Sequence, residues 1–285
     1  MREAKVKCLS TAGFHQMAYV EWGAADNPKV LVCVHGLTRN GRDFDFLAQA
    51  LAADYRVVCP DVVGRGKSDW LSNKSLYVMP QYCADLVTLL ARLNVESVDW
   101  LGTSMGGLIG MALAAQPGNP IRRLVLNDAG PVVSAVSLAR IGDYLGSPPR
   151  CDSVEAAEAY VRAVSASFGP HTDSQWRHLT VHAIREAADG KIEFRYDPGI
   201  AQVYKQGQQL SGGKDVELWP LFDAITCPTL LLRGEQSDLL TAQTAQAMTE
   251  RGPRAQLVDI PGVGHAPTLM NEAQITPVRN FLLQA

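Results

Sequence analysis

The sequence has little charge of either sign and no long apolar run, and both features limit what the protein can bind. Charged residues make up 19% of its 285 residues, and 26 Lys and Arg against 29 Asp and Glu leave a formal net charge of -3. So small a charge provides no large electrostatic footprint for nucleic acid or anionic lipid. The longest nearly apolar run, residues 105–115, is far shorter than the roughly 20 residues that cross a bilayer. We therefore expect no nucleic acid and no membrane as partners.

Cysteines are few and widely spaced, which argues against a disulfide framework or a zinc site. The six cysteines occupy positions 8, 33, 59, 83, 151 and 227, without a CxxC pair. Cys33 and Cys59 lie in apolar, strand-like runs and are expected to be small buried residues. Residues 1–13 also lack the apolar segment of a secretory signal. Reduced thiols and the missing signal together predict a cytoplasmic protein.

Hydrophobic patterning predicts a globular α/β protein. Hydrophobic residues make up 47% of the chain, which is unlike disordered or coiled-coil sequences. Short β-branched runs indicate strands buried on both faces, and apolar residues three and four apart indicate helices between them. Such alternation favours a mostly parallel sheet, to which the first thirty residues could add an antiparallel pair at one edge. The predicted strands cover residues 29–34, 55–59, 97–101, 123–127, 229–233 and 256–260.

The strand and helix alternation stops after residue 126 and resumes near residue 227. The segment between contains helical patterns without a convincing parallel strand. Capping-box spacing of Asp152 with Glu155, and of Thr172 with Gln175, predicts helices over the runs 156–168 and 176–188. We interpret the segment as an insertion, which divides the chain into a first core part, a helical lid and a second core part at residues 1–131, 132–215 and 216–285.

The sharpest local pattern is the sequence GTSMGG at residues 102–107, which follows an apolar strand and precedes a helical run. Larger side chains at Gly102 and Gly106 would collide with neighbouring backbone, so the pattern predicts a strained turn that pushes the Ser104 hydroxyl outward. The amide of Met105, at the start of the helix, would point to the same space and could donate to a developing oxyanion.

A serine hydroxyl becomes an effective nucleophile when a base accepts its proton, and an acid usually orients that base. His265 lies in the glycine-rich loop PGVGHAP after a predicted strand, and Asp238 lies just beyond the strand TLLLR. The chain order Ser104, Asp238, His265 matches one of the known triad orders. Asp128, at the end of the strand LVLN, is a rival to Asp238 for the acid, and we favour Asp238.

With these motifs in this order, the sequence resembles members of the α/β-hydrolase superfamily, in the branch with an inserted helical lid. The similarity covers nearly all of the chain. His35-Gly36-Leu37 resembles the family's HG oxyanion loop, and Asp61–Asp69 resembles its D-x-x-G-x-G-x-S loop. The resemblance implies an eight-stranded, mostly parallel sheet flanked by helices, with no metal and no organic cofactor. It also implies that the amide of Leu37 is the second oxyanion donor beside Met105, and that His35 holds the loop in place.

Ser104 narrows the chemistry that the resemblance implies. Haloalkane dehalogenases and epoxide hydrolases of this fold use aspartate at that position, so both activities are disfavoured. Acyl transfer to water remains, with a small-molecule carboxylic ester as the expected substrate. Lactones, thioesters and diketones cleaved at a carbon-carbon bond stay open as alternatives, as does a non-catalytic, receptor-like binding protein. The oligomeric state stays open.

The acyl group of the expected substrate is uncharged, partly apolar and of small to medium size. Some of the apolar residues of the inserted segment, Trp176 and Tyr144 among them, are expected to face it together with His35 and Gly36. The apolar set comprises Val132, Val133, Val136, Leu138, Ile141, Tyr144, Leu145 and Trp176. His178 and His182 have the spacing of a metal pair, but the glutamate of HExxH is absent, which favours a solvated helix face. Arg39 and Arg42 could meet an acidic acyl group, although solvated charges at a helix start are the favoured interpretation.

Overall fold

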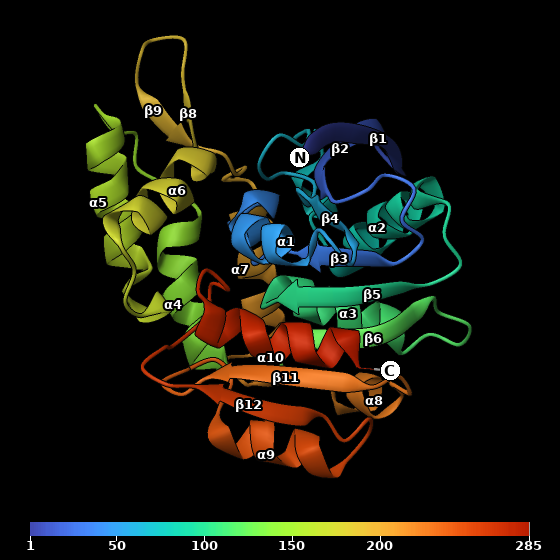
Figure 1. Cartoon of the computed structure of the whole chain (residues 1–285). Coiled ribbons are helices and arrows are strands. Elements are labelled where there is room, and N and C mark those ends of the chain that lie inside the picture. The colour runs from blue at the N-terminus through green and yellow to red at the C-terminus, as the bar shows by residue number, and fades with distance from the viewer. Residues whose placement is uncertain (285) are drawn as a thin grey trace.

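The structure, a computed structural model, describes residues 1–284 except for the side chains of residues 143 and 144, and it shows a sheet with helices on both faces (Figure 1). In this part of the chain the sheet has eight strands in the spatial order β1-β2-β4-β3-β5-β6-β11-β12. The first three strands in that order pair antiparallel, and the remaining pairs are parallel. The predicted fold and its antiparallel edge pair are confirmed. The strands are β1 Arg2–Ser10, β2 Gly13–Trp22, β3 Val30–Val34, β4 Arg56–Pro60, β5 Val98–Thr103, β6 Ile121–Asn127, β11 Thr229–Gly234 and β12 Gln256–Ile260.

Helices on both faces explain why the central strands read as continuous apolar runs. Every residue of β3 and β11 is buried. The expectation of burial on both faces is wrong for β12, of which only Ile260 is buried. β12 is the last strand of the sheet, so one edge of it has no neighbouring strand.

Two helices cover one face of the sheet, α1 (Asp45–Leu51) and α10 (Glu272–Leu283), and share an apolar cluster that includes Leu47 and Phe281. The opposite face carries α2 (Met79–Leu93), α3 (Met105–Ala114) and α8 (Trp219–Asp223). α9 (Ala242–Glu250) packs against β12, and two short 3-10 turns, η1 and η2, cover Gly41–Phe44 and Lys74–Leu76. Among the described residues, the search for a helix of membrane-spanning length and apolarity finds none.

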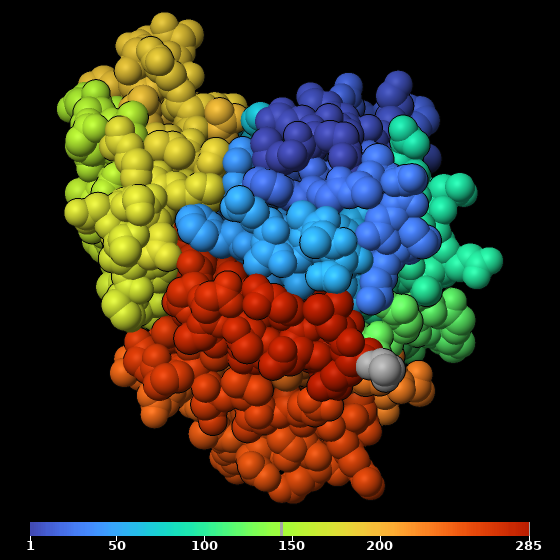
Figure 2. Space-filling view, in the orientation of Figure 1, coloured from blue at the N-terminus to red at the C-terminus, as the bar shows by residue number. Residues whose placement is uncertain are grey.

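Between β6 and β11 the chain leaves the sheet and forms a separate layer at the end where the arrowheads of β3, β5, β11 and β12 lie (Figure 1). Figure 2 shows the yellow-green and gold surface of this segment standing beside the blue surface of the N-terminal strands. The short strands β7 (Val132–Val133) and β10 (Val216–Glu217) pair antiparallel and so join its two ends. Its other elements are α4 Ala135–Leu145, α5 Val154–Val164, η3 Ala166–Phe168, α6 Asp173–Ala183, β8 Ile184–Glu186, β9 Ile192–Phe194 and α7 Ile200–Ser211.

One of the two predicted helix starts in this segment is confirmed. Thr172 accepts from the amide of Gln175, and the Gln175 side chain accepts in return from the amide of Thr172, which completes the capping box of α6. The other start is wrong by one residue, because Ser153 rather than Asp152 caps α5. The predicted run 176–188 is also too long, since Ile184–Glu186 forms a β-hairpin with Ile192–Phe194.

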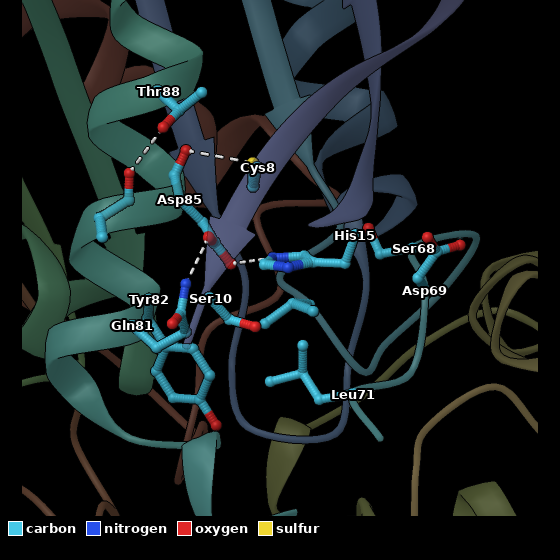
Figure 3. Close-up of polar contacts among 12 residues, drawn as sticks. Cys8, Ser10, His15, Ser68, Asp69, Leu71, Gln81, Tyr82, Asp85 and Thr88 are labelled. Carbon is cyan, nitrogen blue, oxygen red and sulfur yellow. Dashed lines mark hydrogen bonds and ion pairs between the residues drawn. The ribbon is translucent and has the colours of Figure 1, made fainter. Parts of the chain in front are cut away.

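A buried polar cluster joins the β1–β2 hairpin to α2 (Figure 3). Cys8 and His15 are cross-strand partners in the hairpin, and Asp85 of α2 meets them there. The His15 Nε2 atom lies 2.9 Å from the Asp85 carboxylate, and both residues are buried. Burial raises the pKa of Asp85, and its hydrogen bonds with His15 and Gln81 oppose that rise. The hydrogen bond with His15 therefore offsets part of the cost of burying the Asp85 carboxylate.

Removing the imidazole would leave this carboxylate buried with less compensation. We expect His15→Ala to lower the free energy of unfolding by about 3 kcal/mol, the usual cost of breaking a buried pair from one side. Urea denaturation followed by circular dichroism measures the change. Gln16→Ala, at the exposed neighbouring position of β2, is the matched control and should change stability by no more than about 0.5 kcal/mol. Equal effects of the two variants would contradict this role of the pair.

Candidate active site

The site begins at the turn between β5 and α3, where Ser104 has a φ of 51° and a ψ of -114°. A non-glycine residue rarely adopts a positive φ, and such strain persists where the surroundings enforce it. Two glycines make the turn possible. A Cβ atom at Gly102 would lie 2.1 Å from the Gly106 carbonyl oxygen, and one at Gly106 would lie 2.0 Å from the Val34 carbonyl oxygen. The predicted steric reason for both glycines is therefore confirmed.

His265 meets this serine from the loop after β12. Its Nε2 atom lies 3.0 Å from the Ser104 hydroxyl oxygen, and the side chain is 14% exposed. Two hydrogen bonds between this loop and the inserted segment hold the loop in place. The Ser167 hydroxyl donates to the His265 carbonyl oxygen at 2.7 Å, and the Gly264 amide donates to the Ser167 carbonyl oxygen at 2.6 Å. The inserted segment thus fixes the backbone that presents the imidazole.

Asp128, rather than Asp238, is the acid in contact with this imidazole. The Asp128 carboxylate lies 2.6 Å from the His265 Nδ1 atom and is fully buried. It also accepts from the Ser237 hydroxyl at 2.6 Å and from the Gly234 amide at 2.9 Å. These two donors orient the carboxylate toward the imidazole ring.

The expectation that Asp238 fills this position is wrong. Its carboxylate is 54% exposed and pairs with the Arg140 Nη2 atom at 2.8 Å. The turn after β11 directs Ser237 inward and Asp238 outward. β6 lies between β5 and β11 in the sheet, so a residue just beyond β6 is already next to the serine turn. Asp128, with a φ of 51°, occupies that position.

The loop after β3 lies against the serine turn. A Cβ atom at Gly36 would lie 3.7 Å from the Ser104 Cβ atom, so the two backbones approach closely. Met105 is the first residue of α3, where the amide has no acceptor within the helix. The predicted donor pair, the amides of Leu37 and Met105, thus belongs to two segments that adjoin Ser104.

His35 holds the loop in place, as predicted, but it does not line either cavity that meets at Ser104. Its Nδ1 atom lies 2.7 Å from the Gly36 carbonyl oxygen, and its Nε2 atom accepts from the Val62 amide at 2.9 Å. Burial lowers the pKa of this imidazole to about 3. His35 is therefore neutral at ordinary pH with both nitrogens in use, and its expected contact with substrate is wrong.

Arg65 is a residue of this site that sequence reasoning missed. It is fully buried within the loop 61–69 and donates through Nε to the Leu37 carbonyl oxygen at 2.8 Å. Its Nη2 atom lies 3.6 Å from the Met105 sulfur, and its guanidinium lies 5.0 Å from the Tyr82 ring centroid. One guanidinium thus contacts both residues whose amides were predicted to donate. Its place between two glycines of the loop pattern is the signal that could have marked it.

Two cavities meet at Ser104, and both are also lined by Leu37 and Ile141. The larger, about 290 Å³, is almost wholly apolar. Three residues expected to shape the pocket from the inserted segment, Val133, Leu138 and Ile141, line it. The smaller, about 120 Å³, is lined by His265, Arg39 and Arg140 along with aromatic and hydroxyl-bearing residues.

The other residues predicted to contact substrate lie in different places. Gly36 lines the smaller cavity. Trp176 lines neither cavity. It is buried within the inserted segment, with its ring centroid 4.9 Å from that of His171, so its expected contact with substrate is wrong. The Tyr144 side chain lies outside the described residues.

Two groups among the described residues have side chains of the kinds that bind metal ions. Asp45 joins His178 and His182, and Cys8 joins His15 and Asp85, with ligand atoms within 4.8 Å of one another in each group. In the first group Arg42 donates to Asp45 at 2.8 Å and so occupies the place of a cation. Burial and the Arg42 charge lower the pKa of His182 to about 4. In the second, the imidazole and the carboxylate are hydrogen-bonded to each other.

A profile of the alpha/beta hydrolase fold family matches residues 29–271. The chain belongs to this family. It is 51% identical to a 3-hydroxybutyrate-oligomer hydrolase from Cupriavidus necator over 285 aligned positions, which cover 98% of this chain and 97% of the relative. Among solved structures, an alpha/beta hydrolase from Novosphingobium aromaticivorans shares 38% identity at a TM-score of 0.84, covering 98% of each chain. A protein from Rickettsia typhi shares 33% identity at a TM-score of 0.92 and covers all of both chains. This alpha/beta hydrolase is therefore an enzyme.

The contacts of Asp128 and Asp238 predict opposite outcomes for equivalent substitutions. We expect Asp128→Asn to lower kcat for p-nitrophenyl butyrate on the order of 10⁴-fold, because an amide cannot hold the imidazole in the tautomer that accepts a serine proton. Asp238→Asn, which alters an exposed ion pair, should change it less than about threefold. Steady-state kinetics of the purified variants measures both. A crippled Asp238→Asn beside an active Asp128→Asn would reverse the assignment.

Proposed function

We propose that this alpha/beta hydrolase is a serine hydrolase that cleaves carboxylic esters through Ser104, His265 and Asp128. The observation that carries the proposal is the unbroken chain of contacts from hydroxyl to imidazole to buried carboxylate, at 3.0 and 2.6 Å. Each contact is within hydrogen-bond reach, as proton transfer in acyl chemistry requires. The cavities on both sides of Ser104 provide room for the two halves of an ester.

In this mechanism His265 Nε2 accepts the Ser104 proton as the hydroxyl oxygen attacks the ester carbonyl carbon. The amides of Leu37 and Met105 stabilise the negative charge that develops on the carbonyl oxygen. The imidazolium then protonates the leaving alkoxide, and an acyl-enzyme remains. Water, activated by the same imidazole, releases the acid. Asp128 keeps the imidazole oriented and stabilises its charged form throughout.

For the substrate, we propose short oligoesters of 3-hydroxy acids such as 3-hydroxybutyrate. The name of the relative that shares 51% identity over nearly the whole chain supports this choice. The apolar cavity supports it too, because about 290 Å³ is near the lower end of the usual range for ligand pockets and suits a short, methyl-branched acyl unit. A roof that includes Val133, Leu138 and Ile141 would exclude long unbranched chains.

The nucleophile assignment predicts selective labelling. A fluorophosphonate probe should modify the wild-type protein within minutes and leave Ser104→Ala unmodified, because phosphonylation needs the activated hydroxyl. Intact-protein mass spectrometry measures the added mass. Ser134→Ala, at a serine outside both cavity linings, is the matched control and should label like the wild type. An inert wild-type protein would favour a non-catalytic, receptor-like member of the family.

The size of the apolar cavity predicts the substrate profile. We expect kcat/KM to be highest for butyryl and 3-hydroxybutyryl esters and at least about tenfold lower for a laurate ester, because the extra methylenes have no enclosed space to enter. Initial rates on p-nitrophenyl esters from acetate to laurate, and on 3-hydroxybutyrate dimers and trimers, test this. A flat profile with no cleavage of the oligomers would rule out the proposed substrate class.

A further inference from the structure

The two cavities at Ser104 differ in chemistry, and His265 distinguishes them. His265 and Ala266 line the smaller cavity, whereas Met105 and Leu108 line the larger apolar one. In acyl transfer the histidine must return its proton to the leaving oxygen, so the leaving group has to lie on the histidine side. The apolar cavity is then the acyl side, and the smaller cavity is the leaving-group side.

The leaving-group side contains two arginines, and their charges are engaged to different degrees. Arg39 forms a two-nitrogen contact with Asp43, with both distances 2.7 Å, and its Nη2 atom also donates to the Leu179 carbonyl oxygen. Arg140 touches Asp238 through Nη2 alone, and both of these side chains are about half exposed, at 47% and 54%. Among the described residues, Asp238 therefore engages only the Nη2 atom of Arg140. The other guanidinium nitrogens of Arg140 could donate hydrogen bonds to a second carboxylate.

Hydrolysis of an ester of a 3-hydroxy acid separates an acyl half from a leaving half. If the bond cleaved is the last one of the chain, the leaving half is a free hydroxy acid with a carboxylate two carbons from the departing oxygen. Guanidinium groups bind carboxylates through paired, charge-assisted hydrogen bonds. The smaller cavity, which would hold the leaving group, is lined by the cationic side chain of Arg140. This cation complements the negative charge of a hydroxy-acid leaving group.

We propose that Arg140 binds the terminal carboxylate of the leaving hydroxy acid, so that the enzyme cuts oligoesters from their carboxyl end. The proposal rests on the proposed serine-hydrolase function. The Ser104 oxygen forms a bond to the carbonyl carbon, the bond from that carbon to the leaving oxygen breaks, and the His265 proton passes to the departing oxygen. The free hydroxy acid then dissociates from Arg140, and water hydrolyses the acyl-enzyme to release the rest of the chain.

The experiment compares 3-(butyryloxy)butanoate with its primary amide, which has nearly the same shape without the charge. Butyrate release, measured by chromatography, gives kcat/KM for each compound. For the wild type we expect the acid to exceed the amide by about tenfold, the lower end of the range for a charge-assisted hydrogen bond because water screens a half-exposed arginine. Arg140→Gln should bring the ratio close to one through a higher KM for the acid. Arg140→Lys should retain part of the preference.

Two further variants sharpen the comparison. Asp238→Asn removes the competing carboxylate and should raise the ratio of acid to amide above that of the wild type. Arg150→Gln alters an arginine of similar exposure that pairs with Asp189 and lines neither cavity, and it should leave the ratio unchanged. A wild-type ratio near one, or a ratio that survives Arg140→Gln, would overturn the subsite.

The butyryl compounds contain no 3-hydroxyacyl group, so they separate this proposal from the choice of substrate. A preference for the acid with no cleavage of 3-hydroxybutyrate oligomers would retain the subsite and reject the substrate class. Ser104-dependent hydrolysis of p-nitrophenyl butyrate with no preference for the acid would retain the serine-hydrolase function and reject the subsite. If neither butyryl compound is cleaved, inhibition of p-nitrophenyl butyrate hydrolysis by 3-hydroxybutyrate and by its amide decides, and equal inhibition constants would reject the subsite.

Discussion

The site depends on the close approach of three backbone segments around Ser104. Gly102 and Gly106 have no room for a Cβ atom, so β5, α3 and the end of β3 pack backbone against backbone. This packing holds Ser104 at a positive φ and places its hydroxyl where two cavities meet. A side chain at either glycine would have to move the helix or the neighbouring strand. The sheet therefore acts as a rigid frame for one strained residue, and the loops at its carboxyl edge supply the groups that surround it.

Strands and the serine turn were predictable because their signals are local. Six apolar runs matched strands of the sheet, and the glycine spacing around Ser104 follows from contacts within a few residues or with the adjacent strand. The acid was not predictable in this way. Asp128 and Asp238 each follow a strand that ends at the same edge, and only the direction of the turn after β11 decides which carboxylate faces the imidazole. That direction depends on Ser237 and Gly234, whose hydrogen bonds to Asp128 bridge more than a hundred residues.

The inserted segment shows the same limit. An apolar residue in it could face the substrate or the segment's own interior, and composition does not distinguish the two. Ile141 lines both cavities, whereas Trp176 packs inside the segment. Arg65 is the converse case, a charged residue that sequence reasoning would place in solvent. It is buried because the Leu37 and Val63 carbonyl oxygens accept its hydrogen bonds and the Tyr82 ring faces its guanidinium.

Through Ser167, the inserted segment that covers the pocket also supports the loop that presents His265. Ser167 belongs to the inserted segment, yet it both donates to the loop that presents His265 and accepts from it. If that segment swung outward as a rigid flap, the loop would lose both hydrogen bonds, and the imidazole would be less well placed to take a proton. The two hydrogen bonds therefore couple the position of the inserted segment to that of the loop that presents the base. With the segment in its present place, the His265 Nε2 atom lies 3.0 Å from the Ser104 hydroxyl oxygen, so the position of the pocket wall and the alignment of the base depend on the same contacts.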